Sequence, residues 1–235
     1  MDVRRVRMRL RKEAGRELPV VLLVLPRPAL AISSAPHGGG IGMRRWVLNA
    51  QVAGSYLRHD PDEHLRKLAV GLGLAGRGIG MCTAADVRQL HTGEDGGVSV
   101  LATVGLGHAC RAAAPVSPAE AGAAPLVGTI NLLVGVPARL SEAALVNLVA
   151  TVTEAKAQAL WDLGLDATGT PTDAVCVLCP AEGPAERFGG PRSPWGAPAA
   201  RAVHAALMAP GTNPSPVSRR RRAANGEPSP ASQPR

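Results

Sequence analysis

The sequence predicts a single compact α+β domain, in which a mixed and largely antiparallel sheet packs against a few helices. A chain of 235 residues is long enough for one sizeable core. Short runs rich in Val, Ile, Leu and Thr recur along it, separated by Gly or Pro clusters, as is typical of strands. Runs that follow one another this closely pair more easily in antiparallel fashion, because a parallel crossover needs a dozen or more residues.

Eight runs are expected to form strands, near residues 20–25, 29–34, 46–52, 79–83, 87–91, 98–104, 128–136 and 174–179. The first two follow a basic segment and imitate a secretory signal. Prolines at positions 19, 26 and 28 would interrupt a signal helix, and favour two extended runs joined as a strand pair or hairpin. No apolar stretch reaches the roughly 20 residues that a membrane helix needs. We therefore expect a cytoplasmic protein without membrane insertion, with secretion as the alternative.

Two shorter helices are expected near residues 61–72 and 197–208. The first opens with Asp60-Pro61, a helix-start signal. Between the helices, the segment 93–97 (GEDGG) fits the turn of a hairpin.

The clearest element is a helix from about Ser141 to Leu163. Ser141 is a good N-cap, Glu142 complements the helix dipole, and Gly164 ends the helix. Its apolar face comprises Leu145, Leu148, Val149, Val152, Ala155 and Ala159. Its polar stripe comprises Asn147, Thr151, Glu154 and Gln158. This stripe either faces solvent or borders a ligand cleft, and its lack of the long charged side chains usual on an exposed face favours the cleft.

The net charge of +8 is concentrated at the two ends of the chain. Residues 1–17 hold seven basic and three acidic side chains, and residues 211–235 hold five and one, whereas residues 18–210 are balanced. We expect 1–17 to be a basic extension, 18–210 the domain, and 211–235 a disordered tail rich in Pro and Ser. Nucleic-acid binding would rest on these ends alone, so it is not the function that we expect.

The cysteines and histidines show no metal-ligand spacing. Cys176 and Cys179 lie in one predicted strand, where residues three apart point to opposite faces and cannot share a metal ion. The six histidines form no HExxH or similar motif. No metal and no cofactor are therefore expected. With aromatic residues at only 2%, stacking on aromatic rings is also excluded as the main means of binding a ligand.

Three consecutive strings carry a resemblance to a known family: GTINLLVGV at 128–136, SEAALVNLVATVTEAKAQAL at 141–160 and ATGTPTDAVCVLCP at 167–180. Four more agree with it, namely SSAPHGGGIG at 33–42, MCTAADV at 81–87, ATVGLG at 102–107 and FGGPRSPWGAPAARAVH at 188–204. In their order and spacing, they resemble adenosylcobinamide amidohydrolases along about residues 30–208.

The resemblance implies that water cleaves the amide between the corrin ring's propionate arm and aminopropanol, giving adenosylcobyric acid for cobalamin salvage. The partner would be this corrinoid, and a homo-oligomer is left open. A corrinoid-binding or delivery protein without hydrolysis is the alternative function. Loops rich in Gly and Thr would suit a large amide-fringed ligand, although Gly38, Gly39 and Gly40 equally fit a structural turn. The expected ligand-binding residues are Gly38, Gly39, Gly40, Thr83, Asp86, Gly128, Asn147, Lys156, Thr170, Thr172, Arg192 and Trp195.

Amide hydrolysis needs a base or acid and donors for the developing oxyanion. Glu154 is the preferred base, because it lies in the resembling string and on the polar stripe; a surface carboxylate is its alternative role. Asp173 and Asp86 are rival carboxylates beside Thr-rich turns.

Asn131, together with the amides near Gly128 and Thr129, is expected to supply oxyanion donors. A covalent route through Thr129 or Cys82 ranks behind direct attack by water, because neither residue has a nucleophile motif around it.

Overall fold

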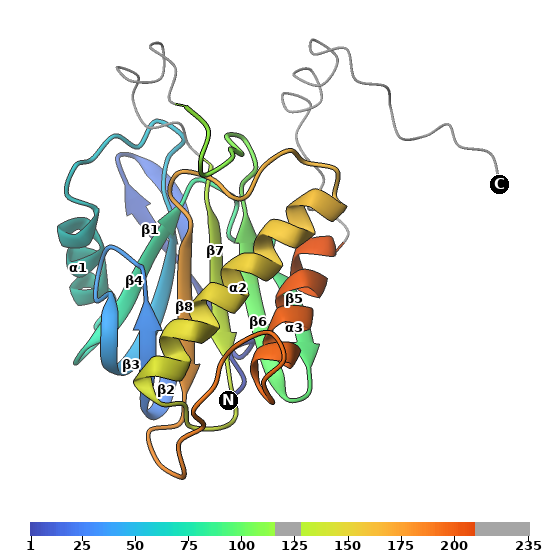
Figure 1. Cartoon of the computed structure of the whole chain (residues 1–235). Coiled ribbons are helices and arrows are strands. Elements are labelled where there is room, and N and C mark those ends of the chain that lie inside the picture. Colours follow the sequence, from blue (N-terminus) through green and yellow to red (C-terminus); the bar gives the residue numbers. More distant parts are fainter. Residues whose placement is uncertain (116–127, 210–235) are drawn as a thin grey trace, which may run out of the picture.

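The computed structural model describes residues 1–115 and 128–209, and the expected tail at 211–235 lies outside them (Figure 1). The strands are β1 (Arg7–Glu13), β2 (Arg16–Ser33), β3 (Gly40–Gln51), β4 (Gly78–Thr83), β5 (His91–Asp95), β6 (Val98–Val104), β7 (Ile130–Gly135) and β8 (Ala174–Cys179). The helices are α1 (Pro61–Gly71), α2 (Glu142–Asp162) and α3 (Gly196–Met208). Among the described residues, no helix is both long and apolar enough to cross a membrane.

The strands form one mixed sheet in the order β4-β3-β2-β8-β7-β6-β5, and β1 pairs with β2. Only β3–β4 and β7–β8 pair in parallel, and the other pairs are antiparallel. The prediction of an α+β domain with a largely antiparallel sheet is therefore confirmed.

The long strand β2 bends, and with it the sheet. The pairing register between β2 and β3 shifts between Val24 and Ala29, the segment that contains Pro26 and Pro28. Before the shift β2 pairs with β1, and after it with β8. The expectation of two separate strands is corrected: proline removes an N–H donor here, but the strand continues through an irregularity.

Because of this bend, the sheet folds into two leaves. The first leaf consists of β1, the first half of β2, the second half of β3, and β4. The second leaf consists of the second half of β2, the first half of β3, and β8, β7, β6 and β5. A core that includes Val47, Met81, Leu133 and Cys176 lies between the leaves. Helix α1 covers the outer side of the first leaf, and α2 and α3 cover that of the second (Figure 1).

The expected N-terminal extension contains part of this fold. Strand β1 pairs with β2 along its whole length, and Val3 is fully buried in the core between the leaves. Most side chains of β1 are exposed, and many are basic, so its charge reflects a solvated strand.

Two further local predictions can be compared with the structure. Strand β5 spans His91–Asp95 instead of residues 87–91, because the turn needs only Gly96 and Gly97, both with positive φ (52° and 83°). Cys176 and Cys179 do point to opposite faces, since they belong to different core clusters.

Candidate active site

A cavity of about 370 Å³ opens between the two leaves, at the end opposite the bend of β2. Its walls come from the segment after β2, the ends of β3 and β4, and the beginnings of β7 and β8. The lining residues that the sequence analysis selected are Thr83, Thr129, Asn131, Thr172 and Asp173. Residues from five segments of the sequence therefore meet at one site.

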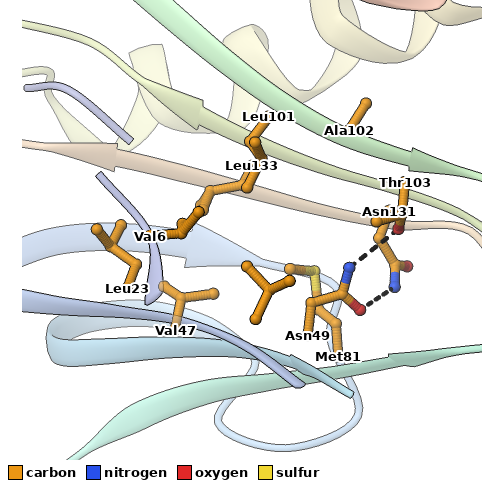
Figure 2. A pocket seen from close by; sticks show the side chains of 11 residues that line it. Val6, Leu23, Val47, Asn49, Met81, Leu101, Ala102, Thr103, Asn131 and Leu133 are labelled. Carbon is orange, nitrogen blue, oxygen red and sulfur yellow. Dashed lines mark hydrogen bonds between the residues drawn. The ribbon is translucent and has the colours of Figure 1, made fainter. Parts of the chain in front are cut away.

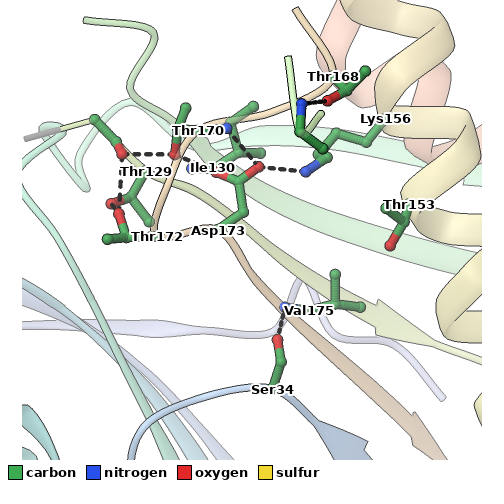
Figure 3. A network of polar contacts seen from close by, with 12 residues as sticks. Ser34, Thr129, Ile130, Thr153, Lys156, Thr168, Thr170, Thr172, Asp173 and Val175 are labelled. Carbon is green, nitrogen blue, oxygen red and sulfur yellow. Dashed lines mark hydrogen bonds and ion pairs between the residues drawn. The ribbon is translucent and has the colours of Figure 1, made fainter. Parts of the chain in front are cut away.

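The carboxylate of Asp173 organises one wall (Figure 3). Its Oδ1 accepts hydrogen bonds from the Ile130 N–H (2.8 Å) and the Thr170 hydroxyl (2.5 Å). Its Oδ2 accepts from the Thr170 N–H (3.1 Å) and forms an ion pair with Lys156 of α2. The Lys156 and Asp173 side chains are only 7% and 10% exposed. Because the carboxylate already accepts four hydrogen bonds, it is better suited to holding these loops together than to removing a proton from water.

A chain of hydroxyl groups leads from Asp173 to the cavity. The Thr170 hydroxyl lies 2.6 Å from the carbonyl oxygen of Gly128, and the Thr172 hydroxyl lies 3.1 Å from the same oxygen. Thr172 in turn is 2.6 Å from the Thr129 hydroxyl. Each hydroxyl has one proton to donate. When Thr172 donates to Thr129, the Thr129 proton is free to reach a ligand in the cavity.

Asn131 lies between this cavity and a much smaller space of about 10 Å³ deeper between the leaves (Figure 2). Its Nδ2 donates to Asn49 Oδ1 (2.8 Å) and to the Cys82 carbonyl (3.1 Å), and Asn49 Nδ2 donates to Thr103 (2.9 Å). Since the Cys82 carbonyl can only accept, these bonds fix the orientation of the Asn131 amide. The residue is 2% exposed, and its Oδ1 has no hydrogen-bond partner among the described residues.

This geometry changes the role expected for Asn131. Both of its N–H protons are already donated, so the side chain has no donor left for an oxyanion. Its unpartnered group is an acceptor, and a buried acceptor without a partner costs about 1–3 kcal/mol. In Figure 2 this oxygen points away from the apolar side chains of the inner space. A ligand that donates an N–H or O–H would satisfy it.

Cys82 lines the cavity but does not suit nucleophilic attack. Burial raises the pKa of its thiol to about 11. The reactive species is the thiolate, which is scarce at neutral pH when the pKa is this high.

The structure places Glu154 outside this group. The polar stripe of α2 divides: Thr151 is buried and donates to the Gly189 carbonyl (2.9 Å), whereas Glu154 and Gln158 are exposed. Glu154 is not among the residues that line the cavity.

Other expected ligand-binding residues also lie elsewhere. Asn147 and Arg192 line a separate, open pocket beside residues 188–194, and Trp195 packs against the core at the start of α3. Asp86 accepts a bond from the N–H of Arg88 (3.0 Å) within its own turn.

The glycines at 38–40 have a structural role. The carbonyls of Gly38 and Gly39 accept hydrogen bonds from the guanidinium of Arg44, which is 1% exposed. A Cβ at Gly38 would lie 1.9 Å from the carbonyl oxygen of Gly78. These contacts support the structural turn that the sequence analysis left as an alternative.

Some cavity residues were missed by the sequence analysis. Tyr56, Arg58 and His59 follow β3 and line the same cavity as Thr129 and Thr172. They lie in a short polar loop without a recognisable motif. The one available signal was that Tyr56 is the only tyrosine in the chain.

Gly169 provides the space for the Lys156–Asp173 pair. A Cβ at this position would lie 2.5 Å from both Asp173 Oδ2 and Lys156 Nζ. We expect Gly169→Ala to lower the free energy of unfolding by about 1–3 kcal/mol, the usual cost of overpacking, as measured by urea denaturation. Gly71→Ala is the control, since a Cβ there meets no atom within 4 Å. Equal effects of the two substitutions would contradict the close packing inferred here.

The described residues contain no group of three or more His, Cys, Asp or Glu side chains that could hold a metal ion. The polar residues that line the cavity carry hydroxyls, a carboxamide, a phenol, a guanidinium, an imidazole, the Cys82 thiol and the Asp173 carboxylate. Such groups can bind and orient an amide and transfer protons.

Comparison with known proteins agrees with this chemistry. Residues 4–214 match the family described as adenosylcobinamide amidohydrolase. The chain is 32% identical over 157 residues to the adenosylcobinamide amidohydrolase of Methanosarcina mazei, covering 66% of this chain and 72% of that protein. It is 31% identical over 195 residues to that of Halobacterium salinarum, covering 80% and 83%. The match to the family extends over most of the described residues, and the chain belongs to the adenosylcobinamide amidohydrolase family.

Proposed function

We propose that this protein hydrolyses the amide that joins the corrin ring's propionate arm to aminopropanol in adenosylcobinamide. The products would be adenosylcobyric acid and aminopropanol, and the acid would re-enter cobalamin synthesis during salvage. Family membership supports an amidohydrolase. The observation that carries the proposal is the buried, unpartnered oxygen of Asn131, a residue that lines the cavity together with the hydroxyl residues Thr129 and Thr172.

The size of the cavity suggests which part of the substrate enters. Its volume of about 370 Å³ is at the lower end of the range for small-molecule sites. We expect the aminopropanol arm and its amide to enter, while the much larger macrocycle stays at the mouth. Leu57 is 54% exposed there, so it could contact the macrocycle.

Two side chains are suited to holding the amide. The substrate N–H would donate to Asn131 Oδ1, an acceptor that has no donor among the described residues. The Thr129 hydroxyl, accepting a hydrogen bond from Thr172, would donate its own proton to a hydrogen bond with the carbonyl oxygen and stabilise the negative charge of that oxygen in the transition state. The Lys156–Asp173 pair would act as a positioning unit, because it fixes the loops that carry both threonines.

The direct test is to incubate the purified protein with adenosylcobinamide and to separate the products by chromatography. Formation of the acid together with equimolar aminopropanol is expected. Tight binding of the corrinoid without either product would support a delivery protein instead, and neither binding nor turnover would overturn both.

We expect turnover to be independent of added metal ions. The cavity offers amide-binding groups but, among the described residues, no cluster of metal ligands. Dialysis against a chelator should leave turnover of adenosylcobinamide unchanged. Loss of turnover that is restored by zinc or another divalent ion would contradict this expectation.

A further inference from the structure

A line of polar contacts runs from the cavity to β1. Tyr56 lines the cavity, and its hydroxyl lies 2.9 Å from His64 Nδ1 in α1. His64 Nε2 lies 3.2 Å from Glu13 Oε1, and Glu13 Oε2 accepts a hydrogen bond of 2.7 Å from Arg11. The loop after β3, helix α1 and strand β1 therefore contribute to one chain of polar groups, which is separate from the threonine network.

The chemistry of the partners fixes the direction of these bonds. A carboxylate only accepts, so Nε2 of His64 carries the proton that Glu13 binds. Nδ1 of the neutral ring is then an acceptor, and the Tyr56 hydroxyl donates to it. The Tyr56 oxygen keeps its lone pairs for a ligand in the cavity. The two rings also stack, with centroids 5.4 Å apart, which holds the hydroxyl in place.

Burial keeps both groups in these protonation states. It lowers the pKa of His64 below its ordinary value of 6.5, against the opposing effect of Glu13. It raises the pKa of Tyr56 to about 12. The charged or titratable groups that act on this pair are Glu13, Arg11, Arg58, Asp60 and Cys82. At neutral pH the resting state is thus a phenol donating to a neutral imidazole.

A buried histidine with two satisfied nitrogens is often purely structural. Here, however, the chain of polar contacts ends at Tyr56, which lines the same cavity as the amide-binding residues Thr129 and Asn131. The same order of groups, a hydroxyl, an imidazole and a carboxylate, lets a hydroxyl exchange protons in hydrolytic sites.

We propose that Tyr56 and His64 form the proton relay for amide hydrolysis, with Tyr56 in contact with the reacting atoms and His64 acting through it. Glu13 and Arg11 are positioning residues that fix the imidazole. This inference rests on the function proposed above, because a relay has no role without the reaction.

The relay accounts for every proton. As water attacks the amide carbon, a C–O bond forms, water gives a proton to the Tyr56 oxygen, and Tyr56 gives its own proton to His64 Nδ1. The imidazolium is stabilised by Glu13. When the C–N bond breaks, the nitrogen takes a proton from Tyr56, and His64 returns its proton to Tyr56. The acid and the amine leave, and the enzyme regains its starting state.

The relay predicts the pH dependence of turnover. Only neutral His64 can accept the proton, so kcat/KM should fall as the pH drops through the pKa of His64. Because burial lowers that pKa, the fall should occur below pH 6.5.

The test compares Tyr56→Phe and His64→Gln with wild type, using adenosylcobinamide turnover across pH. Tyr56→Phe keeps the ring but removes the hydroxyl, and should lower kcat about 10²-fold or more while corrinoid binding persists. His64→Gln keeps one donor and one acceptor but cannot titrate, so the remaining activity should lose its fall at acidic pH. His204→Gln is the control, since His204 pairs with Asp162 (2.7 Å) on the far side of the second leaf. It should behave as wild type.

A further variant and the wild-type result distinguish failure of the relay from failure of the proposed function. Should either variant unfold, Glu13→Gln still tests the relay, because loss of the carboxylate charge should lower kcat and move the acidic fall to lower pH. If the wild type is active and the turnover of Tyr56→Phe is within about threefold of the wild-type value, the relay is wrong and the proposed function still stands. Absence of turnover in wild type would overturn both.

Discussion

Replacement of Lys156 by Met is expected to be strongly destabilising, by about 3–5 kcal/mol in the free energy of unfolding. Methionine fills the space of the lysine stem, but leaves the Asp173 carboxylate as a buried charge without its cation. The penalty arises from that unpaired charge, since Asp173 keeps only its neutral donors. Urea or guanidinium denaturation measures it, and turnover should decrease as the Thr170 loop loosens.

Two controls isolate this effect. Lys67→Met breaks an exposed ion pair with Glu63 (3.5 Å), and should change stability by less than about 1 kcal/mol. Adding Asp173→Asn to Lys156→Met removes the buried charge and should recover part of the loss. A loss for Lys156→Met no greater than for Lys67→Met would show that the pair is not effectively buried.

Replacement of Asn131 by Leu is expected to lower turnover about 10²-fold or more. Leucine is similar in size, but it removes the acceptor that we assign to the substrate N–H, in a cavity where a misplaced amide loses its alignment with the attacking water. Steady-state kinetics with adenosylcobinamide give this change, and a decrease in kcat larger than any increase in KM would indicate lost transition-state stabilisation.

Thr103→Val is the matched variant for Asn131→Leu. Thr103 accepts the hydrogen bond from Asn49 at the other end of the same polar chain, but does not line the cavity. Both substitutions leave a buried amide group unpaired, so both should lose stability. Only Asn131→Leu should lose most of its turnover. Equal turnover in the two variants would assign Asn131 a structural role.

Elements defined by local signals were predictable from the sequence. Helix α2 begins after Ser141, whose hydroxyl accepts from the Ala144 N–H (3.1 Å), and ends before Gly164, as its capping residues indicated. The bend of β2 was not predictable, because prolines mark an irregularity without showing whether the strand ends or continues.

The same limit applies to the candidate site. Thr129, Thr172 and Asp173 could be selected because they stand at the starts of β7 and β8, where Thr-rich turns are conspicuous in the sequence. Glu154 could not be placed, since periodicity gives its face of α2 but not what covers that face. The contact between His64 and Glu13 joins a helix to a strand that is distant in sequence, so no local sequence pattern predicts it.

The bend in β2 also governs the width of the cavity. One wall belongs to each leaf, and the leaves join at the segment from Val24 to Ala29, at the far end of the strands. Because this joint lies far from the cavity, a small change in the angle between the leaves produces a larger change in the distance between the two cavity walls. The spacing between Tyr56 and Thr129 is thus set by residues that touch neither of them.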